Sequence, residues 1–283
     1  MNGIVALVRR PAPTLAQCCE LTFLEREAID FDVAERQHAA YRDALASAGA
    51  RTIVLDAIAS APDSVFVEDT AVVLDEVAIL ANPGVDSRRR EPDFIAAPLS
   101  THRRCIERIA APGTLEGGDV LVVGDTLYVG LSGRSNREGL EQLASIARRY
   151  GYATVPVRVH GSLHLKTACT ALDATTVLLN PAWVEATAFD AFERIEIADD
   201  EPFAANLLPI GATLLANAAF QRTLARVRAH AERAGLRVHA VDISEFGKAE
   251  AGLTCMSLVF AAGLSDAGAH EIDKASAAHR TSS

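Results

Sequence analysis

Short apolar runs separated by polar turns occur in pairs along the chain. The pairs lie at 71–74 and 77–80, at 119–123 and 126–130, at 168–172 and 176–180, and at 207–210 and 212–216. Two apolar runs joined by a short turn predict a β-hairpin. Apolar residues three and four positions apart predict helices from Glu138 to Tyr150 and from Thr223 to Ala234, which end near Gly151 and Gly235. A further strand is predicted after each helix, at 154–159 and at 237–243.

One residue precedes each hairpin at a nearly constant interval. These anchor residues are 48, 48, 42 and 49 positions apart, and they are Glu68, Glu116, His164, Asn206 and Cys255. The interval indicates five repeats of strand, strand, helix and strand. Only the apolar run 256–260 follows Cys255, so the strand at 4–8 and the helix from Asp32 to Ala48 are needed to complete the fifth repeat. We therefore expect residues 1–262 to form one α/β domain closed into a ring, as propeller blades close, and residues 263–283 to form a flexible tail.

Composition and charge narrow the class of protein. The 283 residues are 49% hydrophobic and 23% charged, which excludes a disordered or fibrous chain. The net charge of −10 argues against nucleic acid as a partner, because binding to phosphates draws on clustered Lys and Arg. No apolar run approaches the roughly 18 residues that a membrane span needs. The arginines of residues 1–10 follow the apolar stretch, the reverse of a secretory signal, so we expect a cytoplasmic protein.

Five cysteines without a C-x-x-C pair predict neither a disulfide framework nor a structural zinc site. We interpret Cys18, Cys19 and Cys105 as residues without a role in the site, and we place Cys105 on a helical pattern that it shares with two isoleucines. Cys169 is expected to pack inside a strand. The spacing of His164 and Cys169 gives a zinc site little support.

The ring would gather several reactive side chains near its axis. A cysteine, a histidine and a carboxylate form the general arrangement for nucleophilic catalysis, which Cys255, His164 and Glu116 can supply. Asp63, Glu68 and Asp69 would add negative charge suited to a guanidinium group. Each residue alone is more often structural, but their shared position in the repeat favours a site.

Six stretches match a known family in their order and spacing: DSVFVEDTAVV (63–73), PGVDSRR (83–89), TLEGGDVLVVG (114–124), GLSGRSN (130–136), LHLKTACT (163–170) and GLTCMSLVF (252–260). Over residues 20 to 260 the chain resembles the dimethylarginine dimethylaminohydrolases, which belong to the guanidine-modifying, or pentein, superfamily. The resemblance implies a five-bladed α/β propeller. The stretch 19–30, which would be a mobile lid, matches this family least well.

The resemblance also implies an activity, which is hydrolysis of Nω,Nω-dimethylarginine or Nω-monomethylarginine to citrulline and an alkylamine. Cys255 would be the nucleophile, His164 the general acid and base, and Glu116 its partner, with no metal or organic cofactor. By resemblance, Asp63 and Asp69 hold the guanidinium, and Glu68 is a further acid of the pocket. The resemblance also implies that Arg88 and Arg134 hold the α-carboxylate. The backbone carbonyls of Leu21 and Ala249 would receive the α-amino group. The partner is then a small-molecule substrate, and many enzymes of this size form homodimers.

Three alternative functions remain open. An arginine deiminase would use the same catalytic group and release ammonia, although the deiminases of that branch carry a helical insertion for which 283 residues leave little room. An amidinotransferase would pass the adduct to an amine instead of water. A non-catalytic propeller that binds a partner would lack the cysteine, histidine and acid anchors, all of which are present here.

Overall fold

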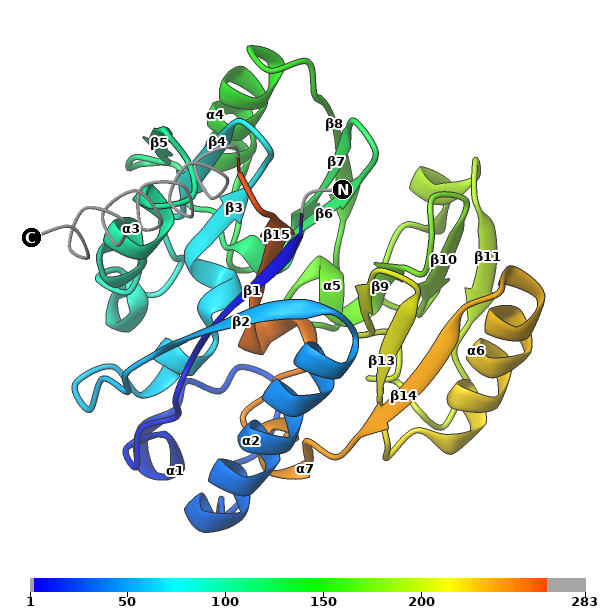
Figure 1. The fold of residues 1–283 in the computed structure, drawn as a ribbon. Helices are drawn as coiled ribbons and strands as arrows, with labels where there is room; N and C mark the ends of the chain where they lie inside the picture. The colour runs from blue at the N-terminus through cyan, green and yellow to red at the C-terminus, as the bar shows by residue number, and fades with distance from the viewer. Residues whose placement is uncertain (1–2, 264–283) are drawn as a thin grey trace, which may run out of the picture.

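The computed structural model describes residues 3–263, whose strands form five three-stranded sheets (Figure 1). The sheets are β3 (Ala71–Val73), β4 (Val77–Leu80) and β5 (Cys105–Arg108); β6 (Val120–Val123), β7 (Thr126–Leu131) and β8 (Ala153–Arg158); β9 (Cys169–Ala171), β10 (Thr176–Leu179) and β11 (Glu193–Glu196); β12 (Leu208–Ile210), β13 (Thr213–Asn217) and β14 (Arg237–Val241); and β15 (Leu258–Ala261), β1 (Ile4–Arg9) and β2 (Ala50–Leu55). In each sheet the middle strand pairs antiparallel with one neighbour and parallel with the other. The predicted tail lies outside the described residues except for Gly263.

The fifth sheet joins the two ends of the described chain. Val5 of β1 pairs antiparallel with Phe260 of β15 and parallel with Arg51 of β2. Figure 1 shows the blue strand β1 beside the orange-red strand β15. The incomplete repeat after Cys255 is therefore completed by the first strands of the chain, as the sequence predicted, and the sheets form a closed ring.

Seven helices connect or flank the strands within residues 3–263: α1 (Leu15–Cys18), α2 (Phe31–Ser47), α3 (Asp93–Ser100), α4 (Arg137–Arg148), α5 (Leu165–Ala168), α6 (Gln221–Ala234) and α7 (Ser244–Gly247). The longer helices α2, α3, α4 and α6 lie at the periphery of the ring in Figure 1. The side chain of Asp30 caps α2 by accepting from the backbone N–H of Val33 at 3.0 Å. Helix α6 ends at Gly235, whose φ of 69° is the left-handed conformation that glycine adopts readily.

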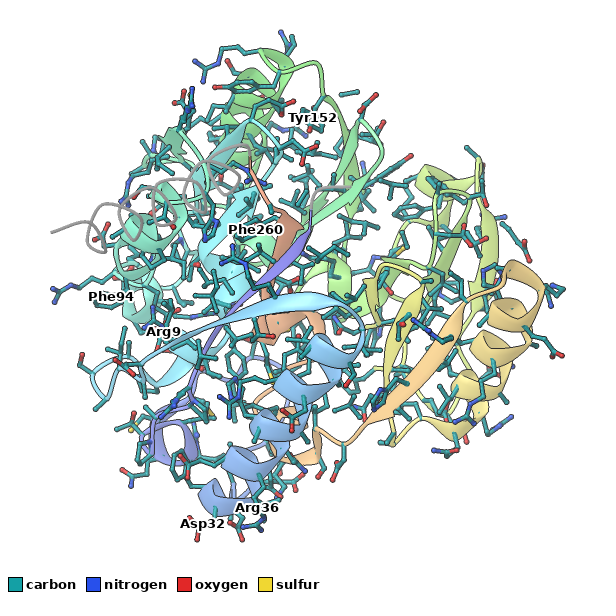
Figure 2. All side chains as sticks on the ribbon, in the orientation of Figure 1. Arg9, Asp32, Arg36, Phe94, Tyr152 and Phe260 are labelled. Atoms are coloured by element: carbon teal, nitrogen blue, oxygen red, sulfur yellow. The ribbon has the colours of Figure 1, made fainter. Side chains whose placement is uncertain are left out.

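Figure 2 shows charged side chains in two different settings, at the outer end of a helix and buried at the end of a strand. Asp32 and Arg36, labelled in Figure 2, lie at the outer end of α2. Arg9, by contrast, is buried at the end of β1 and donates to the carbonyls of Asp56 at 2.8 Å and Phe94 at 3.3 Å. Arg9 thereby ties the closing sheet to helix α3 of the next blade. None of the helices in residues 3–263 is long and apolar enough to cross a bilayer.

Two local predictions were wrong. Cys105 was expected on a helix but lies in strand β5, where it pairs with Val77. The four residues of this strand form hydrogen bonds to β4 instead of a helical turn. In the third blade no α-helix connects β10 to β11, and the connection contains the 3₁₀ turn η5 (Ala186–Phe189) instead. The repeat therefore keeps its three strands in every blade but not its helix.

The first strand of each sheet faces a common axial cavity of about 330 Å³. A short helical turn precedes four of these strands, and these turns are η2 (Val67–Thr70), η4 (Gly117–Asp119), α5 and η6 (Thr254–Met256). Two further turns, η1 (Pro62–Val65) and η3 (Asp86–Arg88), lie elsewhere in the first blade. The turns are joined from blade to blade by side-chain acceptors. Asp69 accepts from the N–H of Gly118 at 3.1 Å, and Asp119 accepts from the N–H of Leu165 at 2.9 Å. These contacts bring the anchor residues together at the axis.

Candidate active site

His164 and Glu116 form a buried pair at the axis. Glu116 immediately precedes η4 and His164 immediately precedes α5, so that their side chains leave equivalent positions of neighbouring blades. Nε2 of His164 lies 2.6 Å from Oε2 of Glu116. Oε1 of Glu116 accepts from the backbone N–H of Gly84 at 3.0 Å. Because both carboxylate oxygens are engaged, Glu116 can hold the imidazole in one orientation.

Carboxylates determine the charge of His164. Burial lowers the pKa of His164, but Asp69, Glu116 and Asp119 outweigh burial and raise the pKa to about 9. Burial likewise raises the pKa of Glu116, but the hydrogen bond and the charge of His164 outweigh it and lower that pKa. At neutral pH the pair is an imidazolium beside a carboxylate, so His164 has a proton to donate.

Cys255 lies in the turn η6, just before the closing strand β15. The residue is buried, and its Sγ accepts from the backbone N–H of Gly252 at 3.3 Å. Burial, followed by the negative charges of Glu68 and Asp69, raises the pKa of the thiol above its usual range, and Lys166 opposes that rise. A cation placed next to this thiol would favour the thiolate, which is the reactive form.

A small cavity of about 20 Å³ lies between these groups. That volume accommodates about one water molecule. Seven of the ten residues predicted for the site line it: Asp63, Asp69, Arg88, Arg134, His164, Ala249 and Cys255. The fold therefore brings together residues from several blades around a single space.

The other three predicted residues, Glu116, Glu68 and Leu21, lie beside the cavity. Glu116 stands behind His164, as its hydrogen bond requires. Glu68 lines the axial cavity, and its Oε2 accepts from the hydroxyl of Thr254, the neighbour of Cys255. Leu21 is half-buried on the stretch 19–30, which we call the lid, and packs against the core cluster that contains Cys255.

The pKa values of Asp69 and Asp63 are shifted in opposite directions. Burial raises the pKa of Asp69, but His164, Arg88 and Lys166 outweigh burial and lower it. Burial also raises the pKa of Asp63, and there the opposing groups are too weak to reverse the shift. The carboxylate of Asp69 is therefore the stronger candidate for holding a cation in this cavity.

The two arginines predicted for the α-carboxylate are engaged to different extents. Arg88 is buried and donates to Asp69 at 2.7 Å and to Glu91 at 2.8 Å. Arg134 donates from Nη2 to the hydroxyl of Thr22 on the lid at 2.9 Å. Its buried Nη1 lies 3.5 Å from Oε1 of Glu116 and makes no hydrogen bond within the described residues. Arg134 therefore has an N–H donor that can still serve an anionic group, whereas Arg88 is hydrogen-bonded to two acids.

One group of metal-ligating atoms occurs at the site within residues 3–263. Ligand atoms of Asp69, Glu116 and His164 all lie within 4.8 Å of one another. These atoms already pair with each other and with arginines, since Nε2 of His164 contacts Glu116 and Asp69 contacts Arg88. The arrangement is better explained as a network of hydrogen bonds and ion pairs than as a set of metal ligands.

The chain is similar in sequence to proteins of one family. The arginine deiminase family model matches residues 57–208, more than half of the chain. Two relatives are each named N(G),N(G)-dimethylarginine dimethylaminohydrolase. The Pseudomonas aeruginosa protein is 36% identical over 255 residues, covering 90% of this chain and 98% of that protein, and the Streptomyces coelicolor protein is 39% identical over 253 residues, covering 89% and 95%. This chain belongs to the dimethylarginine dimethylaminohydrolase family.

A solved structure of a dimethylarginine dimethylaminohydrolase has the same fold. It is the Pseudomonas aeruginosa enzyme, as a cysteine-to-serine mutant complexed with citrulline, and it matches with a TM-score of 0.85 at 34% identity. The match covers 92% of this chain and 100% of that chain. The five-bladed α/β propeller expected from the sequence repeat is confirmed.

Sequence reasoning missed two side chains near the site of this dimethylarginine dimethylaminohydrolase family member. Nζ of Lys166 lies 2.6 Å from Oε1 of Glu68, and this ion pair lines the axial cavity. The buried Asp119 accepts hydrogen bonds from Ser132 and Ser135, each at 2.6 Å. A signal for Lys166 was present, because it is the single Lys or Arg in the apolar stretch LHLKTACTAL. Asp119 gave no such signal, because Gly117-Gly118-Asp119 is an ordinary turn sequence.

Gly118 also has a role beyond that turn. A Cβ atom at this position would lie 2.6 Å from Nδ1 of His164 and 2.7 Å from Oδ1 of Asp69. Those distances are shorter than any ordinary contact, so only glycine leaves room for both side chains. The Gly-Gly-Asp sequence thus permits the crowding of groups at the axis.

Proposed function

We propose that the protein hydrolyses Nω,Nω-dimethylarginine and Nω-monomethylarginine to citrulline and dimethylamine or methylamine. The observation that carries the proposal is the single cavity around which Cys255, the His164–Glu116 pair and Asp69 are arranged. Two relatives that match this chain over nearly their whole length are named for this activity. The substrate class is therefore a small molecule with a substituted guanidinium group.

The cation of the substrate activates the nucleophile. The thiol of Cys255 is neutral at rest because burial and nearby carboxylates raise its pKa. A guanidinium held by Asp69 places a positive charge beside the sulfur, which lowers the free energy of the thiolate, and the thiol proton leaves to solvent. The thiolate then adds to the guanidinium carbon, and the product of addition is neutral.

His164 acts twice. Its imidazolium first donates a proton to the departing dimethylamine nitrogen, and the C–N bond breaks to leave a cationic thiouronium adduct on Cys255. The neutral imidazole then takes a proton from water as the water oxygen adds to the adduct carbon. As the C–S bond breaks, the proton of the new hydroxyl group passes to the sulfur, which releases citrulline and restores the thiol. The free amine takes up a solvent proton in place of the one that the thiol first released. Glu116 holds His164 and stabilises its charged form throughout.

Arginine deimination is the second candidate, because the family model that matches residues 57–208 is described as arginine deiminase. The residues would act in the same way, and the leaving group would be ammonia instead of dimethylamine. The two activities therefore differ in the product nitrogen compound and not in the catalytic group.

Product analysis tests the proposal. The protein is incubated separately with asymmetric dimethylarginine and with arginine, and citrulline, dimethylamine and ammonia are measured. We expect citrulline and dimethylamine in equal amounts from dimethylarginine and little ammonia from arginine. Ammonia from arginine without dimethylamine from dimethylarginine would favour the deiminase, and no citrulline from either would exclude both. The Cys255→Ser variant is the control, because it should keep the fold and lose turnover.

A further inference from the structure

The side chain of Glu250 joins the lid to the segment that carries the nucleophile. Its Oε1 atom accepts from three consecutive backbone N–H groups of the lid: Thr22 at 2.9 Å, Phe23 at 2.5 Å and Leu24 at 2.6 Å. Consecutive N–H groups that converge on one oxygen form a concave anion site. Glu250 is 7% exposed, and its Oε2 atom has no hydrogen-bond partner among the described residues. A buried carboxylate is thus committed to holding the lid.

The backbone at Glu250 is also unusual. With a φ of 60°, it is the one non-glycine residue within residues 3–263 that adopts the left-handed conformation. A side chain is disfavoured there, and glycine would relieve the strain. Glu250 follows the end of helix α7, and its N–H donates to the carbonyl of Gly247 at 3.0 Å. The chain therefore accepts local strain at the position from which this carboxylate reaches the lid.

The hydrogen bonds of Glu250 fix the direction of the two carbonyls that the family resemblance assigns to the α-amino group. In a planar trans peptide the N–H and the preceding C=O point in opposite directions. Because the N–H of Thr22 points at Glu250, the carbonyl of Leu21 points away from that carboxylate. In the same way, the N–H of Glu250 points into α7, which directs the carbonyl of Ala249 away from that helix.

The described conformation has the lid closed. The cavity of about 20 Å³ is too small for an amino acid, since it accommodates about one water molecule. Entry of substrate therefore requires the lid to move, and that movement breaks the three hydrogen bonds to Glu250. Two other acids hold the lid at separate points, since Asp63 accepts from Glu20 at 3.1 Å and Glu245 accepts from Asp30 at 2.8 Å. Glu250 holds the middle of the lid, next to Leu21.

We propose that Glu250 is a positioning residue that closes the lid and directs the Leu21 carbonyl toward the α-ammonium group of the substrate. It acts through the lid backbone and does not react. The inference rests on the proposed function for the identity of the substrate. The lid contact itself can be tested independently of turnover.

Ligand affinity tests the positioning role. In a Cys255→Ser background, dissociation constants are measured by calorimetry for citrulline and for 5-ureidopentanoate, which is citrulline without its α-amino group. Glu250→Gln should weaken citrulline about tenfold or more, because it removes a charge-assisted acceptor, and should weaken 5-ureidopentanoate far less. Equal weakening of both ligands, or of neither, would overturn the proposal.

Two further variants separate the causes of such a loss. Glu250→Gly relieves the backbone strain and removes the carboxylate, so it should behave as Glu250→Gln does; restored citrulline affinity would show that strain, not the carboxylate, matters. Glu245→Gln is the matched control, because Glu245 lies on helix α7, just before the segment that carries Glu250, and binds one lid N–H far from Leu21. It should leave the ratio of the two dissociation constants unchanged, and a change as large as that of Glu250→Gln would overturn the specific role.

The accessibility of Cys255 tests the lid contact without any substrate. In protein that retains Cys255, alkylation of this residue by iodoacetamide is followed by peptide mass spectrometry. Glu250→Gln should speed alkylation about tenfold, because the lid opens more often when the contact is weakened. An unchanged rate would overturn the lid contact. If the parent protein fails to bind citrulline, the proposed function fails, and the alkylation rates still decide the role of Glu250 at the lid.

Discussion

Nε2 of His164 lies 2.6 Å from Oε2 of Glu116, and the two side chains are 3% and 0% exposed. The pair is therefore shielded from solvent, and the charge of each residue depends on the other. Because of this dependence, the pair should affect the free energy of unfolding of the protein as well as its activity.

Stability should depend on pH through this pair. The pKa of His164 is raised to about 9, so the stability it contributes is fully present below its ordinary pKa of 6.5 and is lost as pH rises through 9. Glu116→Gln should therefore lower the free energy of unfolding at pH 6 by up to about 3 kcal/mol, and by less at pH 9.5. Urea unfolding at both pH values measures the difference. Glu141→Gln, at an exposed carboxylate of α4, is the control, and an equal loss at both pH values would contradict the prediction.

Gly118→Ala should impair catalysis. The added Cβ would lie 2.6 Å from Nδ1 of His164, so the imidazole must move. A displacement of this kind costs about a hundredfold in kcat. The rate of citrulline formation measures the loss. Gly3→Ala is a suitable control, because a Cβ at Gly3 meets no atom within 4 Å, and a normal rate for Gly118→Ala would show that the axis is less crowded than described.

Lys166→Met should destabilise the protein. It removes the cation that lies 2.6 Å from Glu68 and leaves a buried carboxylate without its partner. The expected loss is about 3 kcal/mol in the free energy of unfolding. Adding Glu68→Gln should restore much of it, because the unpaired charge is then gone. Urea unfolding of the single and double variants tests this, and no recovery in the double variant would argue against the ion pair.

Arg134→Ala should raise KM for dimethylarginine with little change in kcat. The buried Nη1 of Arg134 lies 3.5 Å from Glu116 and makes no hydrogen bond to residues 3–263, so it has a donor suited to the α-carboxylate of the substrate. Loss of a charged hydrogen bond corresponds to about 10- to 100-fold in KM. The decarboxylated analogue dimethylagmatine provides the comparison, and an equal effect on both compounds would place the carboxylate elsewhere.

Arg88→Ala should act differently from Arg134→Ala. Arg88 is buried between Asp69 and Glu91, so its removal leaves two carboxylates without their cation. We expect a loss of about 3 kcal/mol in the free energy of unfolding, with a lower midpoint in urea. Unchanged stability would mean that Arg88 is free to serve the substrate in the way that the family resemblance implies.

The ring of five sheets could be predicted because hairpins and their interval are local features of the sequence. The pairing of Val5 with Phe260 followed from the same repeat, since an incomplete last unit requires a strand from elsewhere. The gathering of His164 and Cys255 around one cavity followed from their shared position in that repeat. Periodicity thus carried information about contacts between residues far apart in the chain.

Ion pairs between side chains of different turns or blades could not be predicted from the sequence. The pairing of Arg88 with Asp69 joins two different turns, and the pairing of Lys166 with Glu68 joins two different blades. The helical assignment of Cys105 failed because four residues carry too little periodicity to distinguish a strand from a helix. Glu250 had no signal in the sequence, because its role comes from a backbone conformation and from the lid that lies over it.

The pairing of β1 with β15 has a consequence for biosynthesis. Val5 emerges from the ribosome long before Phe260, and at about 5–20 residues per second the delay is on the order of tens of seconds. Until then β1 has only β2 beside it, and the nascent chain also lacks Cys255. Cys255 and the strand that closes the ring are therefore translated together, so the nucleophile is added to the chain only when the ring can close.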